Sequence, residues 1–319
     1  MMYAYRPQAG KLARVDPAEP LTDAIWVDLY HPQPKQVEAV TAYGIEVPTL
    51  ADMEEIEISN RLYRENGVDY MTVVLPGMSD TKTPMVGPVT FILTPAVLVT
   101  VRHHVPRPFE TYPTRAERLG LGCATPDQVF LGLFEEIVGR LADLLESAGR
   151  GLDQVSRAVF LHGDAPRAET LKSALDQVGR EGELLGRVRL SLLTIERAIS
   201  FFLQTQRDRS SAKDLAPVVK GLLRDVQALG VHADFVASRV AMVTDATLGM
   251  INLAQNATVR IVSVVAALFL PPTLIASIYG MNFDGMPELH WTFGYPMALG
   301  LMVASALVTY LFFRWRNWL

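Results

Sequence analysis

IVSVVAALFLPPTLIASIY, residues 261–279, is a run of 19 residues without a charged side chain. A second uncharged run, FGYPMALGLMVASALVTYLFF, covers the 21 residues 293–313. Each run is long enough to cross the roughly 30 Å hydrocarbon core of a bilayer as a helix. The first 250 residues contain no comparable run, so the sequence predicts a two-helix membrane region after a large part that lies outside the membrane.

The charges around these runs predict their orientation. Arg260 precedes the first run, Arg314 and Arg316 follow the second, and the connection 282–292 contains neither Lys nor Arg. Positive charge close to membrane helices marks their cytosolic ends. We therefore expect a multi-pass protein of the plasma (inner) membrane with both termini in the cytosol.

Composition argues against several classes of protein. The net charge of −5 disfavours a nucleic-acid partner, which would need clustered Lys and Arg. The single Cys123 rules out an intramolecular disulfide and a Cys zinc cluster. The six histidines show no ligand spacing, and no phosphate-binding loop or nucleophile elbow is present, so the sequence predicts no cofactor and no enzyme activity.

Residues 1–120 are predicted to form a mixed α/β unit. Short alternating or β-branched runs predict strands, and two segments predict helices, the second with Thr49 as its N-cap. The predicted strands are Ile25–Leu29, Tyr70–Leu75, Val89–Leu93 and Val97–Arg102, and the helices are Pro34–Tyr43 and Thr49–Glu57. The last two strands are close enough to form a hairpin.

The rest of the chain has a helical pattern. Apolar residues recur every three or four positions from Pro126 to about Arg209, with a turn near residues 162–166, which predicts a helical pair. From Asp214 the only proline before Pro271 is Pro217, near the start of the segment, so a single helix about 100 Å long is expected to continue into the membrane. Such a helix needs partners, which favours an oligomer. Two shorter helices joined near residue 230 or 249 are the alternative.

One face of the first membrane run combines polar and apolar side chains. In a symmetric bundle such a face lines a pore whose apolar rings gate by dewetting. Hydrogen bonding between helices explains the same periodicity equally well. The candidate pore residues are Asn252, Asn256, Val259, Val262, Leu270, Thr273 and Ser277.

Three segments around the two runs form a distinctive set. They are Tyr279-Gly280-Met281-Asn282-Phe283, the loop Met286-Pro287-Glu288-Leu289, and the Phe269-Leu270-Pro271-Pro272-Thr273-Leu274 segment upstream. Together they resemble the CorA family of magnesium transporters. The family's hallmark is the Gly-Met-Asn triplet at the outer end of the first membrane helix. The resemblance covers roughly the last 65 residues closely.

The resemblance implies a homopentamer in which Gly280, Met281 and Asn282 form a selectivity filter at the outer entrance. Mg²⁺ holds its water shell tightly, and a ring of neutral amide oxygens accepts hydrogen bonds from those waters. Glu288 would concentrate cations in the outer loop. Val259 stands where some family members carry Met.

The resemblance also implies regulation by cytosolic metal. Family members bind Mg²⁺ at acidic residues between subunits, and Asp225 resembles the helical member of that pair, with Asp80 as its candidate partner. Mg²⁺ would then be both the transported and the regulatory ion.

These observations predict an α+β cytosolic domain with long helices, followed by an all-α membrane region of two helices. The predicted parts are 1–120, the helical pair 121–212, the stalk and first membrane helix 213–279, the outer loop 280–292, and the second membrane helix with a basic end, 293–319. The expected function is influx of Mg²⁺, with Co²⁺ and Ni²⁺ as further candidate ions. The alternatives are a zinc transporter of the same family and a non-conducting membrane scaffold; a membrane hydrolase lacks a nucleophile signature.

Overall fold

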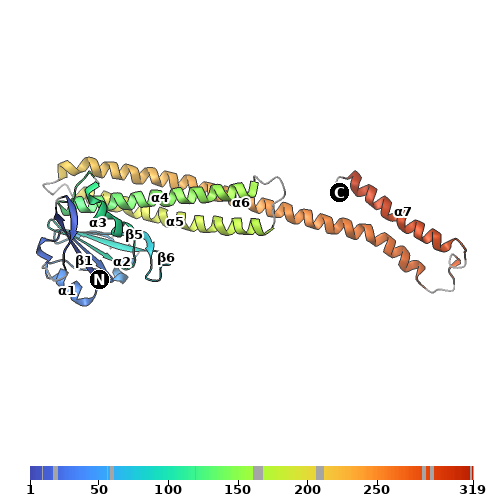
Figure 1. The fold of residues 1–319 in the computed structure, drawn as a ribbon, viewed down its shortest axis with the longest axis horizontal. Helices are drawn as coiled ribbons and strands as arrows, with labels where there is room; N and C mark the ends of the chain where they lie inside the picture. Colours follow the sequence, from blue (N-terminus) through green and yellow to red (C-terminus); the bar gives the residue numbers. More distant parts are fainter. Residues whose placement is uncertain are drawn as a thin grey trace. The chain divides into compact units, whose positions relative to one another are not determined.

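The computed structural model divides into two compact units (Figure 1). The first contains Met1–Arg157 and Leu175–Val243, and the second contains Ala158–Ala174 and Thr244–Leu319. The structure describes residues 1–8, 10–16, 21–55, 57, 61–118, 120–160, 168–205, 212–281, 285–287, 291–316 and 318.

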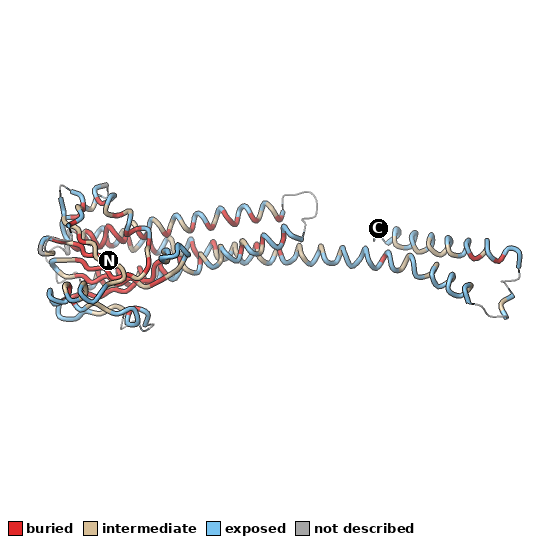
Figure 2. Tube along the Cα trace, turned by 60° about the horizontal axis from the view of Figure 1, so that its bottom comes forward, coloured by how far each residue is buried: buried red, intermediate tan, exposed pale blue. Residues whose placement is uncertain are grey.

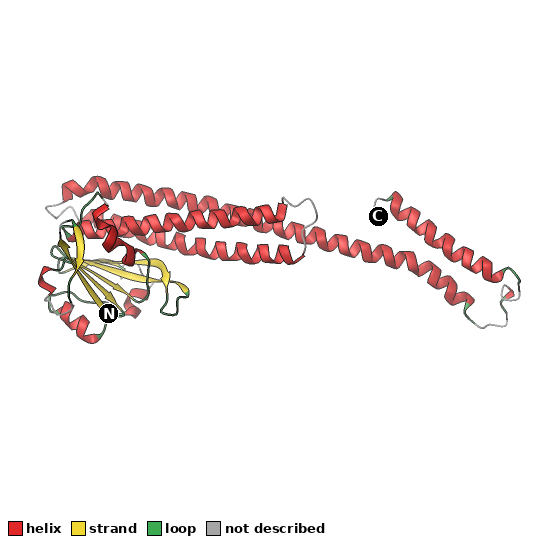
Figure 3. Ribbon diagram, viewed as in Figure 1, coloured by secondary structure: helices red, strands yellow, loops and turns green. Residues whose placement is uncertain are grey.

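A seven-stranded sheet forms the centre of the first unit (Figure 3). The strand order is β2-β1-β3-β7-β6-β5-β4. All neighbours are antiparallel except β3 and β7, which are parallel. The strands are β1 (Met2–Gln8), β2 (Lys11–Arg14), β3 (Trp26–Tyr30), β4 (Leu62–Glu65), β5 (Val68–Met78), β6 (Pro84–Leu93) and β7 (Leu98–Arg102).

The four predicted strands are confirmed as β3, β5, β6 and β7, and the predicted hairpin pairs Leu93 with Leu98. Three strands were not predicted. β2 and β4 are four-residue strands with charged side chains at the two edges of the sheet, and β1 contains Pro7. An edge strand is half solvated, so it lacks the strong apolar alternation of a central strand.

Short helices complete the sheet domain. α1 (Pro34–Thr41) and α2 (Leu50–Glu54) confirm the two predicted helices, and Thr49 caps α2 by accepting a hydrogen bond from the Asp52 backbone N–H at 3.3 Å. The predicted end of the second helix at Glu57 is wrong, because the backbone is already extended at Glu55. A further helix, α3, covers Pro108–Arg115.

Each face of the sheet buries a different apolar layer. On one face, Val27 and Val99 belong to a core with Val40 of α1 and Met53 of α2. On the other face, Phe91 contacts Phe130 and Phe134 of α4 (Pro126–Phe160) and Phe109 of α3, with ring centroids 4.8–6.1 Å apart. The alternation of strand side chains thus places the sheet between two sets of helices.

Three long helices follow the sheet in the chain: α4 (Pro126–Phe160), α5 (Ala168–Thr205) and α6 (Ala212–Tyr279). Within the first unit they run side by side (Figures 1 and 2). Buried apolar side chains recur along all three, including Leu141, Val188 and Val226. The turn predicted near 162–166 lies outside the described residues.

α6 is unbroken for 68 residues. The expectation of a single long helix is therefore confirmed, and the alternative of two helices joined near Gly230 or Gly249 is wrong. Both glycines are helical and no Cβ contact opposes them, so each costs only backbone entropy, about 1 kcal/mol relative to alanine.

His104, which follows β7, is buried and its Nε2 lies 2.9 Å from the Leu75 carbonyl oxygen. Its ring closely approaches the backbone of β5, since a Cβ added at Gly77 would lie 2.6 Å from its Cδ2. Burial lowers the pKa of His104 to about 4. Neutral His104 therefore stabilises the fold above the unfolded pKa of 6.5, and this stabilisation is lost as pH falls toward 4.

We expect the free energy of unfolding to fall by about 3 kcal/mol more in the wild type than in His104→Gln between pH 6.5 and pH 4. The measurement is denaturant unfolding of the solubilised protein in EDTA, followed by circular dichroism. Parallel pH profiles for the two proteins would contradict the assignment.

Candidate functional site

The second unit contains two helices that are long and apolar enough to cross a membrane. They are the second half of α6 and α7 (Gly294–Trp315), which runs back alongside it (Figures 1 and 2). Both predicted spans are thus helical, and they end within two residues of the predicted limits.

The membrane part of α6 has two different faces. Val264 is 3% exposed, and Leu268, Pro271 and Ile275 on the same side are partly buried. The α7 residues Gly294 and Ala298 are also buried. This side of α6 is therefore the one that packs within the chain.

All seven predicted pore residues lie on the other side of α6, and all are exposed: Asn252, Asn256, Val259, Val262, Leu270, Thr273 and Ser277. At 3.6 residues per turn this face is nearly opposite to the packed one. Val259 and Leu270 are 64% and 69% exposed. A face this apolar is covered by lipid or by other copies of the chain when the protein is in a membrane.

The exposed face has a defined order of side-chain chemistry. Two amides at Asn252 and Asn256 are followed by the apolar residues, and these by two hydroxyls at Thr273 and Ser277. The Thr273 hydroxyl donates to the Phe269 carbonyl oxygen at 2.7 Å. Because its proton is used within the helix, the lone pairs of this oxygen are left to accept hydrogen bonds from water or a hydrated cation.

At the end of α6 lies the predicted filter segment. The Gly280 N–H donates to the Ala276 carbonyl at 2.9 Å, and the Met281 N–H donates to the Ile278 carbonyl at 3.2 Å. A Cβ at position 280 would lie 3.0 Å from the Ala276 oxygen, so glycine suits this close turn. The predicted filter residue Asn282 and the loop residue Glu288 lie outside the described residues.

The two candidate regulatory residues have different neighbours. Asp225 is exposed on α6 and raises the pKa of Glu135 on α4, together with the larger effect of burial. Asp80 lies in the hairpin between β5 and β6, where it accepts a hydrogen bond from the Tyr30 hydroxyl and its Oδ2 lies 3.6 Å from His31 Nε2. Their pairing across subunits stays a prediction.

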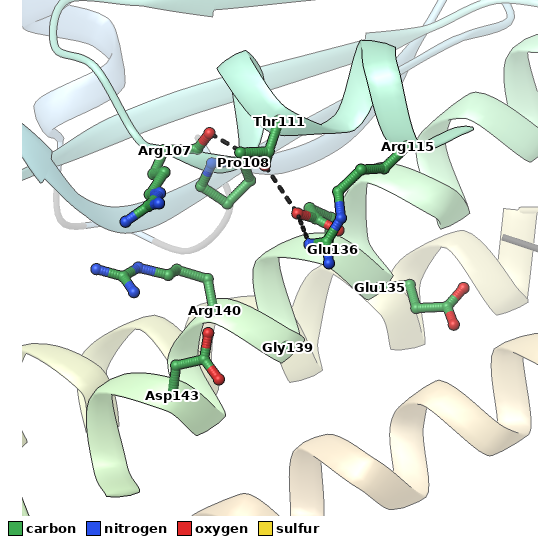
Figure 4. Close-up of a pocket in the computed structure, with 9 residues that line it drawn as sticks. All are labelled: Arg107, Pro108, Thr111, Arg115, Glu135, Glu136, Gly139, Arg140 and Asp143. Carbon is green, nitrogen blue, oxygen red and sulfur yellow. Dashed lines mark hydrogen bonds and ion pairs between the residues drawn. The ribbon is translucent and has the colours of Figure 1, made fainter. Parts of the chain in front are cut away.

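A charged cavity of about 500 Å³ lies between α3 and α4 (Figure 4). The side chain of Glu136 accepts hydrogen bonds from Thr111 at 2.7 Å and Arg115 at 2.8 Å. Arg107 and Arg140 point toward each other on the opposite side of the cavity. No local pattern in the sequence predicts this cavity, because its residues come from two separate helices.

Comparisons with known proteins cover the whole chain. Residues 22–315 match the family described as CorA-like Mg²⁺ transporter protein. The proteins named magnesium transport protein CorA from Yersinia pseudotuberculosis and Haemophilus influenzae are 32% and 33% identical, and each alignment covers 100% of both chains.

Solved structures share the fold. The CorA magnesium transporter from Methanocaldococcus jannaschii has a TM-score of 0.74 and 18% sequence identity, and the likeness covers 100% of this chain and 99% of that one. The ZntB cytoplasmic domain from Vibrio parahaemolyticus has a TM-score of 0.58 and 9% identity, over 77% of this chain and 96% of that one.

The family match extends over both the sheet domain and the two apolar helices, and the two full-length relatives agree with it. The chain therefore belongs to the family of CorA-like Mg²⁺ transporter proteins.

Proposed function

We propose that this protein is a homo-oligomeric channel of the plasma membrane that admits Mg²⁺ to the cytosol. The exposed face of α6 from Asn252 to Ser277 lines its pore. The observation that carries this proposal is the position of that face: it is turned away from the packed side of α6, and it holds amides and hydroxyls that a lipid-facing surface does not need.

A fivefold arrangement accounts for the apolar part of the face. Five copies of Leu270 and Val259 would form rings that exclude water when they are close together. The same contacts would cover side chains that are 64–69% exposed in the single chain. Assembly of five chains would thus form the pore and bury apolar surface in the same step.

Mg²⁺ is the ion that the outer entrance suits best. Asn282 follows Gly280 and Met281 at the end of α6, and its neutral amide oxygen accepts hydrogen bonds from the waters of a hydrated cation. Glu288 attracts cations to the same loop. The names of the full-length relatives support the choice of Mg²⁺ over Zn²⁺, Co²⁺ and Ni²⁺.

The membrane potential drives the flux. Each elementary charge gains about 2.3 kcal/mol per 100 mV, so a divalent cation gains about 4.6 kcal/mol. Cytosolic Mg²⁺ closes the pore by binding Asp225 and Asp80 between subunits. Burial, and after it the charge of Asp225, raises the pKa of Glu135, so a cation bound at Asp225 would also offset the repulsion between these two carboxylates.

Mg²⁺ influx into proteoliposomes that contain a magnesium-sensitive dye tests this function. Influx that grows with an inside-negative potential is expected, and liposomes without protein are the control. Zn²⁺ flux without Mg²⁺ flux would place the protein with zinc transporters, and absence of flux for Mg²⁺, Zn²⁺, Co²⁺ and Ni²⁺ would favour the scaffold alternative.

Substitution of an apolar pore residue tests the assignment of the face. Leu270→Ser should wet the constriction and raise Mg²⁺ flux severalfold when internal Mg²⁺ is high and the wild type is closed. Val265→Ser is the matched control, because Val265 is also exposed but lies off the pore face. Equal flux through the two variants would contradict the assignment.

A further inference from the structure

Two histidines that are 72 residues apart in the sequence meet at one edge of the sheet. His31 follows β3 and His103 follows β7, and these two strands are parallel, with Tyr30 beside Arg102. The carboxyl ends of parallel strands lie at the same edge. Spacing along the chain does not predict this pair, because the two histidines follow strands that are far apart in the sequence.

The two imidazole rings are placed as ligands of one metal ion would be. Their Nδ1 atoms are 3.3 Å apart, and the ring centroids are 5.1 Å apart. Two nitrogens bound to one tetrahedral ion at the usual Zn–N length are about 3.3 Å apart, with ring centroids about 5.2 Å apart. A straight hydrogen bond between the two Nδ1 atoms would hold the centroids farther apart, at about 5.6 Å.

The backbone and the second ring nitrogens fit the same arrangement. His31 has a φ of 45°, a conformation that side chains rarely adopt and that often marks a functional position. Its Nε2 lies 3.6 Å from an Asp80 carboxylate oxygen, as in the carboxylate–histidine–metal arrangement that orients a ligand. Among the described residues, Nε2 of His103 has no hydrogen-bond partner, so Nδ1 is its only nitrogen directed at another polar group.

We infer that His31 and His103 bind a borderline divalent cation, Zn²⁺, Co²⁺ or Ni²⁺, through their Nδ1 atoms, with Asp80 as the positioning residue of His31. Imidazole nitrogens suit these ions, whereas Mg²⁺ prefers oxygen ligands. No group of three or more His, Cys, Asp or Glu side chains converges within the described part of the chain, so water completes the coordination. The His31 side chain is 44% exposed, which gives the ion access from solvent.

Co²⁺ titration of the untagged full-length protein in detergent tests this site. The absorption bands of Co²⁺ report nitrogen ligands directly, and excess Mg²⁺ occupies sites that take hard cations. We expect one nitrogen-bound Co²⁺ per chain, displaced by Zn²⁺. Because binding is measured and not flux, a negative result leaves the proposed transport untouched.

Three variants and one control complete the experiment. His31→Asn and His103→Asn should each abolish the bands; asparagine is chosen at 31 because it tolerates positive φ. Asp80→Asn is compared with the wild type without Mg²⁺, because Asp80 is also a proposed Mg²⁺ ligand, and it should weaken Co²⁺ binding about tenfold. His232→Asn removes an exposed histidine of α6 and should bind as the wild type does.

Unfolding curves show whether each variant is folded. If His103→Asn does not fold, the Co²⁺ bands of His31→Asn test the site, because the His31 side chain is partly exposed and its replacement disturbs the fold less. Unchanged bands in His31→Asn, or a wild type that binds no Co²⁺ in excess Mg²⁺, would overturn the site. The latter result would leave the two rings as a hydrogen-bonded pair.

Discussion

Replacement of Asn282 by alanine is expected to reduce Mg²⁺ influx about tenfold or more and to remove the preference for Mg²⁺. In the proposed filter each subunit contributes one amide oxygen that accepts a hydrogen bond from the water shell of the ion. A hydrogen bond to a charged group contributes about 1.5–3 kcal/mol, and loss of even one such bond corresponds to about a tenfold change. The methyl groups of five alanines in the same ring cannot accept hydrogen bonds from the waters of a hydrated cation.

The measurement is dye-reported influx of Mg²⁺, Zn²⁺ and Ni²⁺ at a fixed membrane potential. His290→Ala is a suitable control, because it removes a polar side chain from the same connection without touching the proposed filter. If Asn282→Ala transported Mg²⁺ at the wild-type rate and with the wild-type selectivity, the filter would have to be sought elsewhere in the chain.

Asp28→Ala is expected to lower the free energy of unfolding by about 3–5 kcal/mol. Asp28 is 2% exposed and accepts from Arg102 Nη2 at 2.8 Å, from Arg102 Nε at 3.1 Å and from the Thr100 hydroxyl at 2.8 Å. The Arg102 guanidinium also lies over the rings of Tyr30 and Phe109, 4.6 and 5.1 Å from their centroids. Without Asp28, this buried positive charge loses its counter-ion.

Denaturant unfolding of the solubilised protein measures this loss. Asp234→Ala breaks a comparable ion pair, Arg189–Asp234 at 2.7 Å, but both side chains are more than half exposed. Its cost should stay below about 1 kcal/mol. Equal destabilisation by the two substitutions would show that burial of the Asp28–Arg102 pair does not increase its contribution to the free energy of unfolding.

Asp28 also illustrates which features the sequence predicts and which it does not. The strands β3 and β7 were predicted from their apolar runs, yet nothing local indicates that Asp28 on one pairs with Arg102 on the other. The parallel register makes this pair, and it also brings His31 beside His103, directly after the register pair Tyr30 and Arg102. Parallel strands are joined by long connections, so the spacing of residues along the sequence does not predict which side chains of the two strands are in contact.

The sequence by itself determined the two apolar spans and the unbroken α6, and it gives the Gly280-Met281-Asn282 segment of the proposed filter. These features are local: a helix is fixed by periodicity, breakers and length, and a span by the thickness of the bilayer. The composition of the α6 face from Asn252 to Ser277 was also visible, but a pore and a packing surface have the same periodicity.

Only the tertiary structure decided which side of α6 packs within the chain and which is left exposed. It also decided the edge strands β2 and β4, the strand β1 that lies beside β2, the histidine pair and the buried ion pair. The physical reason is that these features depend on contacts between distant segments. Their stability comes from burial and pairing in the folded chain, which no stretch of sequence specifies alone.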